Sequence, residues 1–382
     1  MPKLVALSEV SDADIALVGG KAGKLGELVR LGLPVPPGLV VTTEAYQEFV
    51  EGAGLVPVIR ESLAAIDPAK NETVEAASQR IRQAFESAEF PSGLKAEILQ
   101  RVHRYEADHK VRFSAVRSSA TAEDLEGASF AGLQETYLNV TGDAAILAAI
   151  RKCWGSLFTA RVLVYRAKKG FDHRTIRLAV LVQKMVDSRV SGILFTKDPN
   201  TGENHMIVEA GFGLGEAIVG GEVTPDHYVV DGATQRIVQK QIAQQSFRLV
   251  RAEGGGNRRE DLPAEEGGRQ KLSDERVLRL ASLAKVIESN YRRPMDIEWC
   301  ADDHQLYVVQ ARPVTTIPSA PSAPVARNAS PPAGAADNAL VRGMGASPGI
   351  AAGRVRLLRT AAEMEGLKPG EILVTSMTTP DM

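Results

Sequence analysis

The chain has 382 residues, of which 44% are hydrophobic and 24% are charged, and its formal net charge is −2. This length exceeds that of one ordinary domain, and the composition is typical of a soluble globular protein. A net charge so close to zero gives no electrostatic reason to expect a nucleic-acid or membrane partner.

Cysteine usage and hydropathy indicate a cytoplasmic protein. Cys153 and Cys300 lie far apart with no CxxC spacing, which argues against a disulfide framework or a cysteine zinc site and suits a reducing compartment. We expect each to be a small buried residue. No apolar run approaches the ~18 residues of a membrane span. The opening Met1–Val10 mixes charged and apolar residues, unlike a signal peptide.

The first roughly 110 residues predict mostly helices from their apolar periodicity. A proline-set turn that leads into a short strand interrupts them at Leu33–Thr42. The predicted helices cover Lys21–Leu31, Thr43–Val50, Leu55–Ile66, Glu72–Phe85 and Leu94–Tyr105.

The segment from Val111 to Asn139 predicts a phosphate-binding site. Its β-rich run, Phe113–Val116, leads directly to Arg117 and then to residues rich in Ser, Thr, Ala and Gly that a packed core could not use. One fixed cation among hydroxyls and glycine amides suits a polyphosphate, because phosphoryl transfer needs positioning and charge stabilisation. The hydroxyls are those of Ser118, Ser119, Thr121 and Ser129, and the glycines are Gly127 and Gly132.

Strands and helices are expected to alternate from Val111 onward. The charge-rich segment Glu253–Gln270 predicts a mobile loop, and Ser273 then caps an amphipathic helix whose dipole Asp274 and Glu275 complement. Before that loop we expect a helix within Ile146–Tyr165 and buried strands at Leu178–Met185, Gly192–Phe195 and Met206–Glu209.

Two glycine-containing segments resemble nucleotide-binding loops without matching them. Lys21 follows two glycines at a helix entry, but no GxxxxGK[ST] can be read there, so by itself it predicts a surface lysine. Gly211–Gly215 reads GxGxG, with Glu216 where a Rossmann motif needs its third glycine. The functional alternative is a tight backbone near a ribose or adenine, with Glu209 or Glu216 accepting hydroxyl groups.

A second candidate site is a predicted hairpin formed by Pro294–Cys300 and Gln305–Arg312. Strand alternation places Asp296 and Glu298 on one face, and Gln310 and Arg312 share a face of the second strand. If these faces coincide, the hard oxygen ligands suit Mg²⁺ that bridges nucleotide phosphates. The alternative is an exposed edge hairpin whose outer face carries salt bridges.

The C-terminal part predicts a linker and the start of another unit. Ile317–Asn338 is rich in Pro, Ala and Ser, a composition that favours an extended and flexible linker. Beyond it, Leu340–Met382 predicts a β-rich unit with strands near Ala352–Leu357 and Glu371–Val374.

Several motifs, taken in order, resemble the phosphoenolpyruvate synthase (pyruvate, water dikinase) family. The resemblance implies an α/β fold, a two-lobed ATP-grasp domain over residues 1–316, a linker over 317–338, and a partial phosphohistidine (swivelling) domain over 339–382. The motifs are VGGKAGKLGEL, LGLPVPPGLVVT, AVRSSATAEDLEGASFAGLQETYLNV, CWGSLFTARVLVYR, VQKMVDSRVSGILFTKDP, GFGLGEAIVGGEVTPDHY, and MDIEW followed by VVQARPVTT.

The resemblance also implies roles for individual residues. Lys21 and Arg117 would hold the phosphates of ATP, under a glycine-containing lid that runs from Ala128 to Thr136 and includes Gly132. Gln183–Val186, with Met185, would pass beside the adenine, and Glu216 would lie near the ribose. Glu298 and Gln310 would bind Mg²⁺, with Asp296 and Arg312 assisting at the reacting phosphates.

By the same resemblance, ATP pyrophosphorylates a histidine on a separate domain. Hydrolysis then leaves phosphohistidine, which phosphorylates pyruvate. Gly343–Val355 and Glu371–Met382 resemble the opening of that domain, but the motif with the histidine is absent from the sequence. We therefore expect an N-terminal fragment or a truncated reading frame, acting with a phosphohistidine domain in cis or in trans.

Three alternative functions stay open. They are a rifamycin phosphotransferase-type dikinase, a stand-alone ATP-binding partner or regulatory module, and, ranked third among the related enzymes, a pyruvate, phosphate dikinase.

Overall fold

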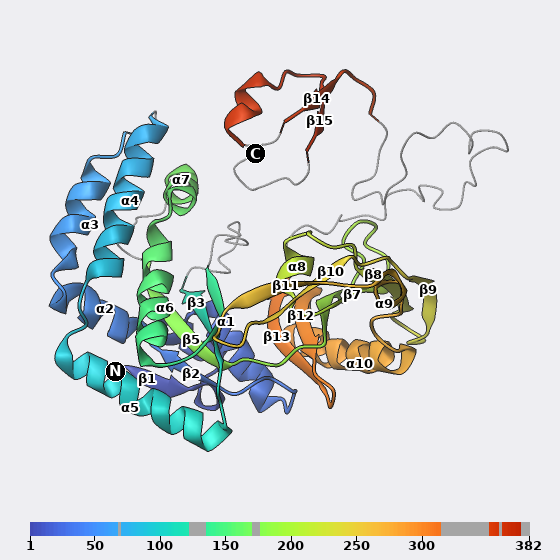
Figure 1. The fold of residues 1–382 in the computed structure, drawn as a ribbon, viewed down its shortest axis with the longest axis horizontal. Coiled ribbons are helices and arrows are strands. Elements are labelled where there is room, and N and C mark those ends of the chain that lie inside the picture. Colours follow the sequence, from blue (N-terminus) through green and yellow to red (C-terminus); the bar gives the residue numbers. More distant parts are fainter. Residues whose placement is uncertain (68–69, 122–134, 170–175, 315–350, 359–360, 376–382) are drawn as a thin grey trace.

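The structure, a computed structural model, describes residues 1–67, 70–121, 135–169, 176–314, 351–358 and 361–375. Figure 1 shows two sheets side by side, with most of the helices gathered around the first. The described part of the chain is a mixed α/β structure in which both large sheets are antiparallel.

The first sheet has five strands in the order β1-β2-β5-β3-β4. Its two faces are buried differently, because successive strand residues point to opposite sides. Val180 and Val182 of β5 pack on the side of the helical layer, whereas Ala179 and Leu181 face α1 (Ile15–Arg30). The strands are β1 (Leu4–Ala6), β2 (Gly38–Val41), β3 (Ser114–Ala120), β4 (Thr136–Val140) and β5 (Leu178–Lys184).

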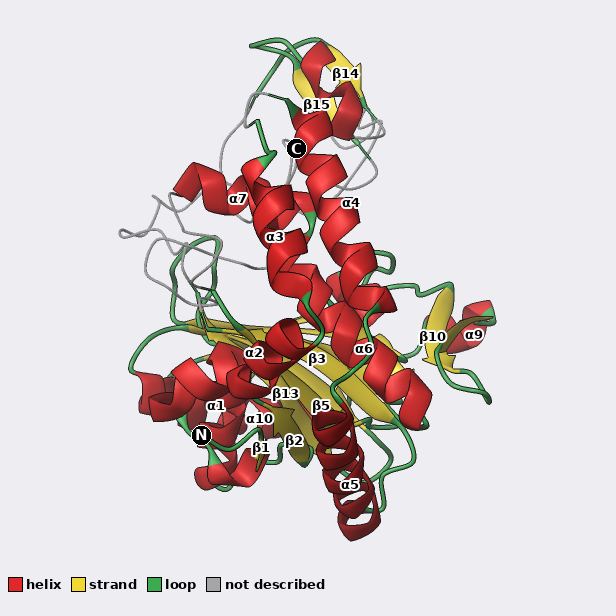
Figure 2. Ribbon diagram, turned by 90° about the vertical axis from the view of Figure 1, so that its left-hand side faces the viewer, coloured by secondary structure: helices red, strands yellow, loops and turns green. Residues whose placement is uncertain are grey.

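A helical layer covers the outer face of this sheet. Figure 2 shows α2, α4 and α6 stacked above it, and aromatic contacts among Phe49, Phe85 and Trp154 tie these three helices together. The helices are α2 (Thr43–Gly52), α3 (Leu55–Ala64), α4 (Asn71–Ser87), α5 (Ser92–His109), α6 (Asp143–Gly155) and α7 (Ala160–Lys169).

The second sheet has six strands in the order β13-β12-β6-β7-β8-β9, and α10 (Asp274–Tyr291) covers one face. Helix α1 shares this second core, so it lies between the two sheets and joins them. The strands are β6 (Val190–Phe195), β7 (His205–Phe212), β8 (Asp226–Asp231), β9 (Ile237–Gln241), β12 (Met295–Ala301) and β13 (Leu306–Pro313). A separate hairpin of β10 (Phe247–Arg251) and β11 (Asn257–Asp261) accompanies the short helices α8 (Glu216–Val219) and α9 (Ala264–Gly267).

The predicted helices and most predicted strands are confirmed, with shifted bounds. Two expectations are wrong. Helix and strand do not alternate throughout: after β5, four strands (β6 to β9) pair antiparallel with only α8 among them. The segment expected to be a mobile loop, Glu253–Gln270, contains β11 and α9, because pairing with β10 orders a strand whose own residues are mostly charged. Ser273 caps α10 as predicted, since its hydroxyl accepts from the amide of Arg276.

Near the C-terminus, β14 (Val355–Leu357) and β15 (Ile372–Val374) pair parallel, where two strands were predicted. The predicted linker lies outside the described residues, and the division of the chain into residues 1–316, 317–338 and 339–382 stays a prediction. No helix among the described residues combines the length and apolar character needed to cross a membrane.

Candidate functional site

A cavity of about 450 Å³ opens where the two sheets meet. Strands β3, β4 and β5 line it from the first sheet, β6, β12 and β13 from the second, and α1 contributes one lysine. Residues that are far apart in sequence therefore share one space. The predicted site residues in its lining are Lys21, Arg117, Thr136, Gln183, Met185, Glu216, Glu298, Gln310 and Arg312.

Arg117 joins the two sheets at the wall of this cavity. It lies on β3, and only 6% of it is exposed. Its guanidinium donates to Gln183 Oε1 at 3.2 Å, to the Val309 carbonyl and to Gln310 Oε1 at 3.2 Å. The Gln183 amide is engaged on both sides, because its Nε2 donates to the Pro36 carbonyl at 3.0 Å. A cation with five fixed donors is thus oriented before any ligand arrives.

The hairpin of β12 and β13 brings its polar residues together as predicted. Asp296 lies opposite Arg312, and Glu298 lies opposite Gln310. Gln310 Nε2 donates to Glu298 Oε1 at 2.8 Å, and Arg312 Nε donates to Asp296 Oδ2 at 2.8 Å. Asp296 is 8% exposed and does not line the cavity itself, so it acts on the cavity through Arg312. The alternative of an exposed edge hairpin is wrong, because β12 also pairs with β6, and Glu298, Gln310 and Arg312 line the cavity.

Lys21 owes its place to a kink in α1. Gly19 has φ +74°, and a Cβ there would lie 2.0 Å from the Ser119 carbonyl oxygen, so only glycine permits this approach to β3. The helix restarts with Ser119 Oγ accepting from the Ala22 amide at 3.0 Å, and Lys21 Nζ donates to the Ser118 carbonyl at 3.0 Å. The expectation of a surface lysine is wrong, because Lys21 is 8% exposed and lines the cavity.

The hydroxyls expected to bind phosphate are placed elsewhere. Ser118 and Ser119 are fully buried and absent from the cavity lining, and both hydroxyls bond within the protein, Ser118 Oγ to the Glu135 carbonyl at 3.0 Å. That expectation is wrong for these two residues, which position α1 and β4 instead. Thr121 also bonds to backbone, at the Arg177 carbonyl. The remaining residues of this prediction, Gly127, Ser129 and Gly132, lie outside the described residues.

Part of the cavity lining is apolar. It includes Met185 and Val186, in the connection between the two sheets, together with Leu138, Leu214 and Val219. An aromatic base is the part of a nucleotide that suits such a surface. Sequence reasoning placed Met185 here but missed Leu138 of β4, because that position depends on how the two sheets face each other.

The GxGxG segment enters the lining through Leu214, Gly215 and Glu216. Gly213 has φ +87°, and a Cβ there would lie 2.4 Å from the Leu249 carbonyl oxygen, so this glycine lets the chain pass β10. Glu209 does not line the cavity; its carboxylate lies 3.8 Å from His227. Of the two carboxylates proposed for a sugar, the structure brings only Glu216 to the cavity.

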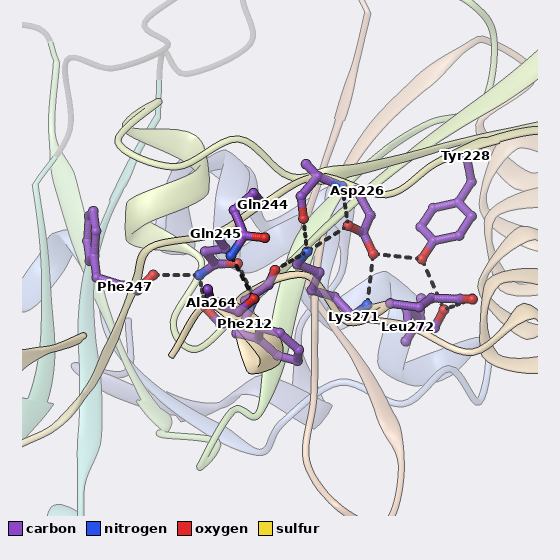
Figure 3. Close-up of polar contacts among 12 residues, drawn as sticks. Phe212, Asp226, Tyr228, Gln244, Gln245, Phe247, Ala264, Lys271 and Leu272 are labelled. Carbon is purple, nitrogen blue, oxygen red and sulfur yellow. Dashed lines mark hydrogen bonds and ion pairs between the residues drawn. The ribbon is translucent and has the colours of Figure 1, made fainter. Parts of the chain in front are cut away.

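A buried polar network supports the GxGxG segment (Figure 3). Gln245 accepts from the Phe212 amide at 2.9 Å and donates to the Phe212 carbonyl at 3.0 Å, so it fixes the residue that precedes Gly213. Beside it, Lys271 Nζ lies 2.9 Å from Asp226 Oδ1, with both side chains fully buried. No sequence pattern indicated this ion pair, because its partners are 45 residues apart.

Cys300 is a further lining residue that sequence reasoning treated only as buried. It is a free cysteine, and burial raises the pKa of its thiol to about 12, with Arg117 acting in the opposite direction. The thiol is therefore protonated near neutral pH and is a poor nucleophile there.

The donor set of the cavity fits Mg²⁺ bound together with a phosphate ligand. Glu298 offers a carboxylate and Gln310 an amide oxygen, both of which are hard oxygen donors. Within the described part of the chain, no group of three or more His, Cys, Asp or Glu could hold a metal by itself. In proteins, Mg²⁺ ordinarily keeps waters and substrate oxygens among its ligands.

Comparison with known proteins agrees with this geometry. Residues 15–331 match the family described as "Pyruvate phosphate dikinase, AMP/ATP-binding domain". A "Probable phosphoenolpyruvate synthase" of Archaeoglobus fulgidus is 44% identical over 377 residues, which cover 98% of this chain and 50% of the relative. The "Phosphoenolpyruvate synthase" of Pyrococcus furiosus is 39% identical over 98% of this chain and 50% of the relative.

The chain spans about half the length of these curated relatives, and a third, the "Probable phosphoenolpyruvate synthase" of Methanocaldococcus jannaschii, is 41% identical over 32% of its own length. The resemblance stated from the motifs is confirmed. This chain is homologous to phosphoenolpyruvate synthases and belongs to the pyruvate phosphate dikinase AMP/ATP-binding domain family.

Proposed function

We propose that this chain is the ATP-binding, histidine-phosphorylating module of a phosphoenolpyruvate synthase. The observation that carries the proposal is the convergence of Lys21, Arg117, Glu298, Gln310 and Arg312 on one cavity whose lining also includes apolar residues. We assign the two sheets, with the cavity between them, to the two lobes of an ATP-grasp fold. The whole reaction converts ATP, pyruvate and water to AMP, phosphoenolpyruvate and phosphate.

The charged residues in the cavity lining suit a triphosphate. Lys21 and Arg117 are buried cations with fixed partners, and Arg312 is held in place by Asp296. Cations that are oriented in advance stabilise charge as it develops, without the cost of reorganising solvent. Glu298 and Gln310 would hold Mg²⁺, which, when bound, screens the phosphate oxygens and orients them.

The proposed transfer moves a pyrophosphoryl group from ATP to a histidine. An imidazole nitrogen of the acceptor histidine forms a bond to the β-phosphorus, and the bond from that phosphorus to the oxygen it shares with the α-phosphate breaks. AMP leaves with the electron pair of this bond. Water then cleaves the pyrophosphoryl-histidine to phosphohistidine and phosphate. Lys21, Arg117 and Arg312 would share the charge that builds on the leaving AMP. The acceptor histidine and the pyruvate site belong to a phosphohistidine domain and a further domain, in cis or in trans.

The first test is calorimetric titration of this chain with ATP, with and without Mg²⁺. We expect binding that Mg²⁺ strengthens, and we expect Glu298→Ala to remove the strengthening. Glu86→Ala, an exposed carboxylate on α4 that does not line the cavity, is the matched control and should bind as the unsubstituted chain does. Equal binding by Glu298→Ala in Mg²⁺ would contradict the metal assignment, and no binding by the folded chain would contradict the nucleotide site.

A second test separates the acceptors. Labelled ATP is incubated with this chain, a phosphohistidine domain and either pyruvate with a pyruvate-binding domain or a rifamycin with a rifamycin-binding domain. Phosphoenolpyruvate formation supports the synthase, and a phosphorylated rifamycin supports the related antibiotic-modifying enzyme. ATP binding with no label on any histidine would indicate a binding or regulatory module.

A further inference from the structure

A chain of side-chain hydrogen bonds crosses from the first sheet to the rim of the cavity. Asn139 of β4 donates from Nδ2 to Asn257 Oδ1 at 2.7 Å, and Asn257 of β11 donates from Nδ2 to Glu216 Oε2 at 2.5 Å. An ionised carboxylate only accepts hydrogen bonds, so the side-chain NH2 of Asn257 must face Glu216 and its side-chain oxygen must face Asn139. The charge on Glu216 therefore sets the direction of the whole relay.

The tip of the β10–β11 hairpin contacts Asn139. Asn139 is 1% exposed and adopts φ +55°, a left-handed conformation that asparagine tolerates better than most residues. Its carbonyl accepts from the Gly256 amide at 3.1 Å. A Cβ on Gly255 would lie 3.0 Å from the same oxygen, and Gly255 has φ +98°. Backbone and side chain of Asn139 thus both hold the β10–β11 hairpin.

Strand β10 of the hairpin contacts segments on both sides of the cavity as well. Arg251 of β10 lies 3.2 Å from the Asp187 carboxylate, in the connection between the sheets, and its guanidinium lies 4.6 Å from the ring centroid of Phe113, which precedes β3. The Leu214 amide donates to the Leu249 carbonyl at 2.9 Å. The hairpin therefore spans from the first sheet to the GxGxG segment, along the edge of the cavity at which Glu216 lies.

We propose that Asn257 is a positioning residue that holds Glu216 for the ribose of the bound nucleotide. With Oε2 fixed by Asn257, Oε1 of the same carboxylate is oriented as the acceptor for a ribose hydroxyl, and the link to Asn139 ties this acceptor to the first sheet. The inference rests on the proposed function, because it assumes that the cavity binds ATP. If the hydrogen bonds of Asn257 were purely structural, their loss would change the stability of the protein but not its preference between ribose and deoxyribose.

The experiment measures dissociation constants of the full chain for ATP, 2′-deoxy-ATP and 3′-deoxy-ATP, together with the thermal midpoint Tm. The unsubstituted chain should prefer ATP over at least one deoxy analogue by roughly tenfold, as is typical for a hydrogen bond to a charged group. In Asn257→Ala, the logarithm of the ratio of the two dissociation constants should fall by at least about half. This fall should come from weaker ATP binding, while binding of the deoxy analogue stays unchanged. Asn257→Asp should lose more, because it sets a second carboxylate against Glu216.

Two further variants complete the test. Asn139→Gly tolerates the left-handed backbone and removes the donor at the far end of the relay without touching Glu216, so it should lower the preference by less than Asn257→Ala. Arg258→Ala, next to Asn257 on β11, removes an exposed side chain that pairs with Glu260, and it should keep both the preference and the affinity.

The outcomes separate the two proposals. An unsubstituted chain that binds ATP with no preference for ribose, or an Asn257→Ala variant that weakens all three nucleotides equally, would overturn the inference alone. Absence of ATP binding by the unsubstituted chain would overturn the proposed function and this inference with it.

Discussion

The Asp226–Lys271 and Arg117–Glu298 pairs each bring a carboxylate toward a cation inside the protein, in very different surroundings. Lys271 Nζ donates to Asp226 and to the carbonyls of Ala243 and Gly267, which uses all three of its donors. Asp226 accepts in addition from the amides of Ala243 and Lys271. Both side chains are fully buried, and neither lines the cavity.

The cavity pair is more open. Arg117 Nη2 lies 3.7 Å from Glu298 Oε2, longer than a hydrogen bond, and the Glu298 side chain is 25% exposed. Among the described residues Glu298 accepts one hydrogen bond, from Gln310, although a carboxylate can accept about four. Burial of charge is thus common to both pairs. A candidate site differs from a structural ion pair in that its groups line a cavity and can still make hydrogen bonds to a ligand there.

The largest expected effect is on stability, at the closed pair. Asp226→Asn removes the negative charge and leaves Lys271 buried without its counterion, so we expect the free energy of unfolding to fall by about 3–5 kcal/mol. Denaturant unfolding measures this loss. Asp261→Asn, at an exposed pair with Arg259, is the control and should cost less than about 1 kcal/mol. Similar losses in the two variants would show that the buried network is not a stability element.

The next effect is on chemistry, at the open pair. Arg117→Ala should lower phosphoryl transfer in the full-length enzyme by ~10² or more, as is typical when a cation at a developing charge is lost. The fold should remain, with a smaller loss of stability than Asp226→Asn shows. Transfer rates and denaturant unfolding of the same preparations check both statements. Parallel losses of stability and activity would mean that Arg117 is only structural.

A third prediction concerns the metal. Gln310→Glu places a second carboxylate beside Glu298, so without Mg²⁺ the two charges repel each other, and with Mg²⁺ they supply one more anionic ligand. The strengthening of ATP binding by Mg²⁺ should therefore grow, by roughly tenfold if about 1.4 kcal/mol is gained. Titrations with ATP at several Mg²⁺ concentrations measure the change. An unchanged Mg²⁺ dependence would place the metal elsewhere.

The smallest effect concerns Cys300, which shares the cavity. Because burial raises the pKa of its thiol to about 12, the thiolate is scarce near neutral pH, and its fraction should rise tenfold per pH unit up to that value. Alkylation by iodoacetamide should thus be far slower than for an exposed thiol of pKa ~8.5, and ATP should slow it further. Peptide mass spectrometry, with Cys300→Ser as the control, separates this signal from Cys153. Labelling as fast as that of an exposed thiol would contradict this account.

Much of the site could be predicted because some of its relations are local. The alternation of β12 and β13 is a period of two within one strand, so strand parity alone assigns Asp296, Glu298, Gln310 and Arg312 to matching faces. The Ser273 cap likewise depends only on the residues that follow it. Ser118 and Ser119 were misassigned because a hydroxyl in a phosphate-like segment can equally serve the backbone of a neighbouring helix or strand.

By itself, then, the sequence determined the family, the periodic elements and the residue types that phosphate and magnesium require, since all of these are read from neighbours along the chain. Tertiary structure alone decided that Lys21 is buried, that Asp226 meets Lys271 and that Asn257 reaches both Asn139 and Glu216. These contacts join residues separated by tens to more than a hundred positions. They form only when two sheets pack around α1, and no local pattern records that packing.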